Sequence, residues 1–379
     1  MKFAHISDLH LGISLLNHSM MEDQTYILNE ILTILKEEQV EALFIAGDVY
    51  DRGVPSVEAV NALNDFLTSL AQSNIHVYMI AGNHDSPSRL AFGSRLLAQV
   101  NIHIVGSYEG ALAHFIEEDS YGEIHIYGLP FVRPAYINRY IEKEEEKVTS
   151  YQEAIQKVIT EANIDWSKRN LILAHQFVIG AHLDTEGSEE IMVGGVDQID
   201  ANLFQAFDYT ALGHIHRPQK VKQDNIRYSG TPLAYSFAEK EQIKSIPIIT
   251  IQEKGDMDIQ YVELKPYRKM AHLETSFKEL LEEKMRKQYE KDYLHITLTD
   301  AQEIEHAIVT LRNYYPYLLR LDYKQQSQTT SPLYNKEIHK SKLELFEDFF
   351  TMRNQKQMSM EQKAYVQNLM DTLEKEKNV

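Results

Sequence analysis

The hydrophobic positions of this chain form short runs that are separated by longer amphipathic stretches. Five runs are too short for helices, and several are rich in β-branched or aromatic residues, so they predict buried strands. They are Lys2–Ile6, Ala42–Ala46, His76–Ala81, Asn170–Ala174 and Tyr209–Leu212. Helical patterns at Met20–Glu38 and Ser56–Ser73 separate the first three runs. This alternation predicts βαβ units, and hence an α/β fold with a largely parallel sheet.

The pattern changes after residue 100. Shorter strands are expected at Asn101–Val105, Ala113–Glu117 and Ile124–Tyr127. A long charged helix or helix pair is expected at Arg133–Ala162. After Leu212, turn signals separate strands of a second, mostly antiparallel set, expected at Gln219–Val221, Ile226–Ser229, Ser245–Ile251 and Ile259–Leu264. Two sheets with helices outside them are the simplest assembly.

The last third of the chain contains further units. Three strands alternate with two helices over Met270–Tyr323, which predicts a small α+β domain. Gln325–Ser331 is polar, so it predicts a linker. Helices are expected after it at Ser341–Asn354 and Ser359–Lys377. We therefore expect four segments: a main domain (1–265), a small domain (266–324), a linker (325–340) and a helical pair (341–379).

Composition narrows the class of protein. A length of 379 residues predicts two or three domains. The absence of cysteine excludes disulfides, a cysteine nucleophile and thiolate metal sites. No run approaches about 18 apolar residues, and the N-terminus lacks an apolar signal core, so we expect a cytoplasmic protein. The net charge of -18 argues at first against nucleic acid, but residues 201–379 hold 26 acidic and 26 basic residues, so the excess acidity lies entirely in the first half.

Polar side chains follow all five predicted strands directly. Ligands of open α/β sheets bind at the carboxyl ends of the strands, so these side chains are candidates for one site. Seven of them offer nitrogen or oxygen donors: Asp8, His10, Asp48, Asn83, His175, His214 and His216. Seven donors are too many for one ordinary metal and suit two, and imidazole with carboxylate suits Mn, Fe or Zn. Asp48 is the most plausible bridge. Two metals about 3.5–4 Å apart serve in-line displacement at phosphorus, with a metal-bound hydroxide as the nucleophile.

Other residues of these motifs suggest roles beside the metals. His84 follows Asn83, and it is placed to contact a phosphate oxygen or to protonate the leaving oxygen. Asp51 is a candidate to orient His84 by a hydrogen bond. Basic residues directly after the last motif, at Arg217, Lys220 and Lys222, are candidates for DNA contacts.

The order of these motifs resembles the calcineurin-like metallophosphoesterase superfamily. The motifs are SDLHLG (7–12), GDVYDRG (47–53), GNHD (82–85), His175 and GHIH (213–216). The flanking segments LPFVRP (129–134), ALGHIHR (211–217) and RYSGTP (227–232) point within it to bacterial DNA nuclease subunits. GDVYDRG also matches protein Ser/Thr phosphatases, in which its arginine contacts phosphate. Those enzymes carry GDxHG and GNHE where this chain has SDLHLG and GNHD, so Arg52 is left without a role.

The resemblance implies a four-layer αββα sandwich with a small α+β capping domain and a C-terminal helical hairpin. It implies two metal ions, expected to be Mn²⁺, with Asp48 shared by both. One set of ligands would be Asp8, His10, Asp48 and His216, and the other would be Asp48, Asn83, His175 and His214. His84 would be the catalytic histidine.

The resemblance also implies a substrate and partners. The substrate would be DNA, cut by 3′–5′ exonuclease action on duplex ends and by endonuclease action on single strands and hairpins, in DNA end processing, repair and recombination. The chain would form a homodimer within a heterotetramer with an ABC-type ATPase. The helix Ser341–Asn354 carries several large apolar residues, which favours a partner contact at the C-terminal helices. A phosphomonoesterase or cyclic-nucleotide phosphodiesterase, and a binding protein with a vestigial site, are the alternatives.

Overall fold

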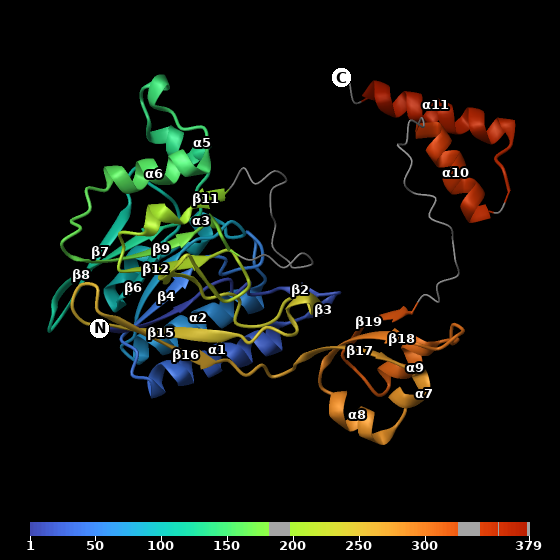
Figure 1. Cartoon of the computed structure of the whole chain (residues 1–379), viewed down its shortest axis with the longest axis horizontal. Helices are drawn as coiled ribbons and strands as arrows, with labels where there is room; N and C mark the ends of the chain where they lie inside the picture. The colour runs from blue at the N-terminus through green and yellow to red at the C-terminus, as the bar shows by residue number, and fades with distance from the viewer. Residues whose placement is uncertain (182–197, 325–341, 355, 377–379) are drawn as a thin grey trace. The chain divides into compact units, whose positions relative to one another are not determined.

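A computed structural model describes residues 1–181, 198–324, 342–354 and 356–376 (Figure 1). The chain divides into two units, Met1–Lys324 and Gln325–Val379. The first unit contains two six-stranded sheets. Among the described residues, no helix is both long and apolar enough to span a membrane.

The first sheet has the strand order β16-β15-β1-β4-β5-β6. Its strands are β1 (Lys2–Ile6), β4 (Ala42–Ala46), β5 (His76–Ile80), β6 (Ile102–Val105), β15 (Ser245–Ile251) and β16 (Met257–Glu263). Strands β1, β4, β5 and β6 run parallel, and β15 pairs antiparallel with β1. Every residue of β4 is buried, as a strand covered on both faces requires.

The second sheet has the strand order β13-β14-β12-β9-β8-β7. Its strands are β7 (Ala113–Asp119), β8 (Gly122–Leu129), β9 (Arg169–His175), β12 (Tyr209–Gly213), β13 (Gln219–Val221) and β14 (Gln223–Tyr228). Strands β8, β9, β12 and β14 run parallel, and only the edge strands β7 and β13 are antiparallel. Two short strand pairs lie beside the two sheets: β2 (Ser14–Leu15) with β3 (His18–Ser19), and β10 (Phe177–Ile179) with β11 (Gln198–Asp200).

Helices cover the outer face of each sheet (Figure 1). They are α1 (Met21–Glu37), α2 (Val57–Gln72), α3 (Pro87–Leu90), α4 (Ser94–Leu97), α5 (Pro134–Ile137) and α6 (Tyr151–Glu161). Among the described residues, 3-10 turns lie at Ala98–Val100, Asn138–Tyr140, Glu144–Glu146, Ala201–Phe204 and Phe237–Glu239. Ser56 caps α2 by accepting a hydrogen bond from the Ala59 N–H, as its position before the helical pattern suggests.

Three hydrophobic clusters show four layers. Ile31 of α1 and Phe66 of α2 pack on the outer face of the first sheet. Phe3, Phe44 and Tyr209 belong to the cluster between the two sheets. On the outer face of the second sheet lies a third cluster, which includes Ile155 and Val158 of α6 with Ile172 and Leu212 of the sheet. The expected αββα architecture is therefore confirmed.

Two sequence predictions of local structure are confirmed only in part. The segment 133–162, predicted as one long helix or a helix pair, holds the two helices α5 and α6, but two 3-10 turns separate them and α5 is a single turn. Asn138 closes this connection, because its side chain bonds both the N–H and the C=O of Val148, at 2.9 and 2.8 Å. The late strands pair mostly antiparallel, as predicted, β13 with β14 and β15 with β16, but they do not form a sheet of their own, since β13 and β14 join the second sheet and β15 and β16 join the first.

A smaller sheet follows the sandwich. Strands β17 (Met270–Thr275), β18 (Tyr293–Leu298) and β19 (Leu318–Tyr323) run parallel, and helices α7 (Phe277–Leu280), α8 (Glu283–Tyr289) and α9 (Ala307–Arg312) connect them. The predicted α+β alternation is thus present. Tyr293 also packs into the cluster beneath α1 and α2, so the small sheet contacts the sandwich.

The second unit is a pair of helices, α10 (Lys342–Asn354) and α11 (Met360–Glu376). Phe346 and Phe350 of α10 and Tyr365 of α11 line a cavity of about 350 Å³ between them. Phe349 is more than half exposed. The predicted linker 325–340 lies outside the described residues.

Candidate metal centre

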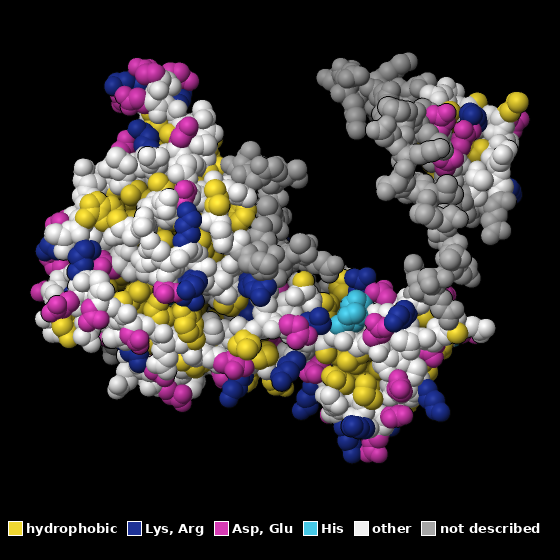
Figure 2. Space-filling view, viewed as in Figure 1, with side chains coloured by type: hydrophobic (Ala, Val, Ile, Leu, Met, Phe, Trp, Pro, Cys, Tyr) yellow, Lys and Arg dark blue, Asp and Glu magenta, His cyan; other side chains and the backbone are white. Residues whose placement is uncertain are grey.

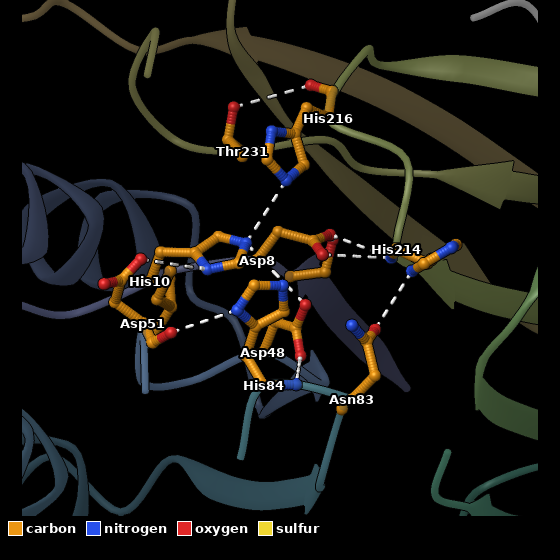
Figure 3. Close-up of polar contacts among 12 residues, drawn as sticks. Asp8, His10, Asp48, Asp51, Asn83, His84, His214, His216 and Thr231 are labelled. Atoms are coloured by element: carbon orange, nitrogen blue, oxygen red, sulfur yellow. Dashed lines mark hydrogen bonds and ion pairs between the residues drawn. The ribbon is translucent and has the colours of Figure 1, made fainter. Parts of the chain in front are cut away.

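The predicted ligand residues lie at one edge of the sandwich, where strands of both sheets end (Figure 3). Strands β1, β4 and β5 bring polar residues from the first sheet, and β9 and β12 bring them from the second. Because the strands within each group run parallel, their carboxyl ends meet at the same edge. The side chains of all the predicted ligands except Asn83 are buried.

Tight loops hold the ligand residues of the first sheet. The Asp8 N–H donates to the Gly47 carbonyl at 3.0 Å, and the His10 N–H donates to the Asp48 carbonyl at 3.0 Å. The loop after β1 therefore pairs with the loop after β4. Gly82 must be glycine, because a Cβ there would lie 2.0 Å from Asp48 Oδ1. The glycines before Asp48 and Asn83 therefore let the loops approach one another.

Asp48 lies at the centre of the cluster. On one side, His10 Nε2 is 3.7 Å from Asp48 Oδ2 and 3.2 Å from His216 Nε2 (Figure 3). On the other side, His175 Nε2 is 3.4 Å from the same Asp48 oxygen and 3.0 Å from Asn83 Oδ1. Asp48 therefore separates two groups of donors.

Asp8 and His214 complete the cluster. The His214 N–H donates to Asp8 Oδ1 at 3.0 Å, and His214 Nδ1 lies 3.1 Å from Asn83 Oδ1 (Figure 3). The structure thus brings together all seven residues that the sequence singled out as donors.

The charges of the clustered side chains are set by burial and by close pairing. Burial raises the pKa of Asp8 to about 6. Burial also opposes ionisation of Asp48, but His175 and the other nearby histidines outweigh it and hold the pKa of Asp48 below its usual range. In turn, Asp48 overcomes the effect of burial on His175 and raises the pKa of that imidazole. Burial lowers the pKa of His10 to about 3.

This donor set fits divalent metal ions. Three groups of possible ligands have atoms within 4.8 Å of one another: Asp8 with His10 and His216, His10 with Asp48 and His84, and Asp8 with Asp48 and His175. The Nε2 atoms of His10 and His216 face each other, an arrangement in which a cation can accept both lone pairs. Neutral imidazole is the form that binds metals, and the low pKa of His10 keeps it neutral.

His84 lies beside the ligands. Its ring is perpendicular to that of His10, with ring centroids 4.9 Å apart, and its main-chain N–H donates to Asp48 Oδ1 at 2.9 Å. His84 Nδ1 lies 3.0 Å from the main-chain carbonyl of Asp51, which accepts its proton. The Asp51 carboxylate instead pairs with Arg52 Nε at 3.1 Å. The contact expected from Asp51 is therefore made by the backbone and not by the side chain.

The candidate DNA-contact residues differ in their surroundings: the two lysines form ion pairs outside the ligand cluster, and Arg217 lies next to a ligand residue. Lys220 pairs with Asp224 at 2.7 Å, and Lys222 pairs with Asp200 at 2.8 Å. Arg217 directly follows His216 and is partly exposed. Both lysine ammonium groups are thus neutralised by carboxylates outside the ligand cluster.

Two further side chains hold the ligand loops. Asp85 accepts hydrogen bonds from the N–H groups of Val49, Tyr50 and Gly82, at 3.1, 2.9 and 2.8 Å. Gln24 of α1 donates to the carbonyl of His10 at 2.8 Å. Asp85 is the last residue of the GNHD motif, so the motif could have identified it as a residue of the site. Nothing in the local sequence distinguishes Gln24 from other residues of a helix.

The fold and the cluster define a class of protein. The chain belongs to the calcineurin-like phosphoesterase family, whose model matches residues 1–218. The resemblance indicated by the motifs is therefore confirmed. This family uses divalent metals, so the chain is a metal-dependent hydrolase with a buried Asp/His cluster able to hold the metal.

Particular relatives are similar over most of the chain. A protein of Staphylococcus saprophyticus named as the SbcD component of the nuclease SbcCD is 29% identical over 379 residues, which is 98% of each chain. Its namesake in Staphylococcus epidermidis is 29% identical over 324 residues, 85% of each chain. A second family model, described as Type 5 capsule protein repressor C-terminal domain, matches residues 266–354. A solved dimetal phosphatase from Danio rerio covers 70% of this chain and 98% of its own, with 13% identity and a TM-score of 0.43.

Proposed function

We propose that the chain is a two-metal DNA nuclease, the nuclease component of an SbcCD-type complex. The observation that carries this proposal is the position of Asp48 between two groups of buried donors. The similarity of nearly the whole chain to proteins named as the SbcD component of the nuclease SbcCD supports a nuclease activity.

The proposed ligands divide into two sets that share Asp48. Asp8, His10 and His216 would hold one ion, and Asn83, His175 and His214 would hold the other; both ions are proposed to be Mn²⁺. When bound, the ions would supply positive charge at the phosphoryl oxygens and lower the pKa of the attacking water. The chain's own task is to hold the donors rigidly, which the paired loops and the glycine at position 82 support.

His84 is proposed to act on the substrate itself. The Asp51 carbonyl accepts the Nδ1 proton, which leaves Nε2 as the nitrogen that meets the substrate. From there, the imidazole stabilises a phosphoryl oxygen or delivers a proton to the leaving oxygen.

The wider assembly is also a proposal. We infer 3′–5′ exonuclease action on duplex ends, endonuclease action on single strands and hairpins, and a homodimer bound to an SbcC-type ABC ATPase. The segment 1–265 would form the nuclease domain, and 266–324 would cap it. The helices of 341–379 would bind the ATPase after the linker 325–340. The partly exposed Phe346 and the exposed Phe349 of α10 support a helix-in-groove contact. Arg217 is the best-placed of the proposed DNA-contact residues.

The test is cleavage of end-labelled linear and hairpin DNA by the purified chain with Mn²⁺, with Asp48→Asn as the matched variant. Cleavage that the variant lacks is the expected result, because Asp48 would bind both ions. A small aryl phosphate monoester is the comparison substrate. Turnover of the monoester without DNA cleavage, even with the ATPase added, would contradict the nuclease proposal and favour a phosphomonoesterase.

A further inference from the structure

A buried ion pair lies behind His216, on the Nδ1 side of the ring. Glu239 belongs to the 3-10 turn Phe237–Glu239 and is 1% exposed, and Lys244 is 6% exposed. Lys244 Nζ lies 2.7 Å from Glu239 Oε2. Burying two charges is unfavourable, so packing alone does not explain an ion pair this close to a ligand residue.

Lys244 fastens this pair to the backbone of His216. Its ammonium donates to the His216 carbonyl at 3.0 Å and to Thr231 Oγ1 at 2.7 Å. Thr231 lies next to the same carbonyl in Figure 3. The charge of the ammonium is balanced by one oxygen of Glu239, so the second oxygen is not needed for the ion pair.

The second oxygen of Glu239 is directed at the imidazole. Glu239 Oε1 lies 3.6 Å from His216 Nδ1, and within the described part of the chain it has no hydrogen-bond partner. A buried carboxylate oxygen without a donor is unfavourable. A small rotation of the ring would bring the Nδ1–H of His216 within hydrogen-bond distance of Oε1. The opposite nitrogen, Nε2, already faces His10.

His175 shows the same arrangement with a different acceptor. Its Nδ1 lies 2.8 Å from the Ala46 carbonyl, and its Nε2 faces Asp48. A proton fixed on Nδ1 leaves the Nε2 lone pair available to a metal.

We propose that Glu239 is the positioning residue of His216. It accepts the Nδ1–H of His216, keeps Nε2 directed at the metal centre, and makes this imidazole a stronger donor than a neutral acceptor would. Lys244 keeps Glu239 ionised and in place. The inference rests on the proposed function only in taking His216 as a metal ligand.

The test compares Mn²⁺ binding to the full-length wild type and to Glu239→Gln, by titration calorimetry and by the Mn²⁺ electron paramagnetic resonance signal. We expect the affinity of one of the two ions to fall about 10–100-fold, and that of the other to change little. The matched control is Asp119→Asn, which removes a largely buried carboxylate paired with Arg169, at the opposite end of β9 from His175. It is expected to lower the melting temperature without changing either affinity.

If the Glu239→Gln variant is less stable but binds both Mn²⁺ ions with unchanged affinity, the proposal is wrong, and the ion pair of Glu239 with Lys244 has only a structural role. If that variant does not fold, Glu239→Gln with Lys244→Met leaves no buried charge unpaired and must show the same selective loss.

A second measurement needs no change to Glu239. Long-range ¹H–¹⁵N spectra of the Zn²⁺-loaded wild type are expected to show His216 protonated at Nδ1, with the signal assigned by its loss in His216→Asn. A proton at Nε2 would overturn the proposal. If the wild type binds two Mn²⁺ ions but does not cleave DNA, the proposed function is contradicted, whereas the comparison of Mn²⁺ affinities between wild type and Glu239→Gln still tests the role of Glu239.

Discussion

At the scale of single residues, four of the seven proposed ligand residues have backbone conformations that L-amino acids rarely adopt. The φ angles of Asp8, His10, Asp48 and His214 are 53°, 43°, 47° and 107°. Such conformations cost about 1–3 kcal/mol each and persist where the surrounding structure enforces them. Here the paired loops and the side chains of Gln24 and Asp85 do so. The strain supports a functional role for these residues.

His84 and Asp51 can be separated by mutation. His84→Gln is expected to lower kcat by about 10²–10⁴-fold and to leave Mn²⁺ affinity nearly unchanged, because it removes proton transfer but no proposed ligand. Asp51→Asn is expected to lower kcat by less than about tenfold, because the main-chain carbonyl of Asp51, and not its carboxylate, contacts His84. The kcat of each variant is measured with bis(p-nitrophenyl) phosphate and with DNA as substrates. An equal loss in the two variants would mean that the carboxylate orients the histidine.

His5 predicts a pH dependence of stability. Burial lowers its pKa to about 3, against about 6.5 in the unfolded chain, so the folded state binds fewer protons. Stability is then fully present above pH 6.5 and is lost as the pH falls toward 3. His5→Phe is expected to reduce this loss by up to about 1.4 kcal/mol per pH unit between pH 6 and 4.5.

Urea unfolding with a chelator present measures the effect of His5, because the chelator removes the contribution of metals. The exposed His306 provides the control, and His306→Asn should follow the wild type. Parallel pH profiles for wild type and His5→Phe would contradict the prediction.

At the scale of elements, one buried side chain fastens the small sheet to the sandwich. Arg268, just before β17, pairs with Asp23 of α1 at 2.8 Å and donates to the Tyr317 hydroxyl at 2.8 Å. Its guanidinium carbon lies 4.5 Å from the ring centroid of Tyr267 and 4.3 Å from that of Tyr317. The Tyr293 hydroxyl of β18 donates to the same Asp23 at 2.6 Å. Figure 2 shows charged side chains of both signs spread over the surface, whereas this pair is buried.

Arg268→Met is therefore expected to destabilise the first unit by about 3–5 kcal/mol, because Asp23 would remain buried without its cation. Adding Asp23→Asn should recover part of the loss. Urea unfolding and limited proteolysis after residue 265 measure the effect. Arg320→Met is the control, since its pair with Asp322 is exposed and worth at most about 1 kcal/mol. Similar losses in both variants would contradict the role of Arg268.

At the scale of the whole molecule, the two units allow the chemistry to be separated from the proposed assembly. The entire ligand cluster lies within Met1–Lys324, and the helical pair lies in the other unit. A chain ending at Lys324 is expected to hydrolyse bis(p-nitrophenyl) phosphate within about threefold of the full-length rate, and to lose co-elution with the ATPase in gel filtration. Retained co-elution would place the partner contact on the first unit.

Features that depend on neighbouring residues could be predicted from the amino-acid order alone. Short apolar runs predicted β1 and β4 with their observed bounds, and the polar residues after the runs marked every donor of the cluster. Their spacing also identified the family. These features follow from local chain geometry, because a buried strand and the turn after it need particular residues in order.

The meeting of distant segments, in contrast, emerged only from the packing of the folded chain. Packing placed β9 and β12 in a second sheet, so that His175 faces Asp48 and His214 faces Asn83 of the first sheet. Packing also determined that the main-chain carbonyl of Asp51, and not its carboxylate, contacts His84, and it placed Glu239 next to His216. Pairings between residues tens to hundreds of positions apart are chosen by the packing of whole layers, and no local pattern records that choice.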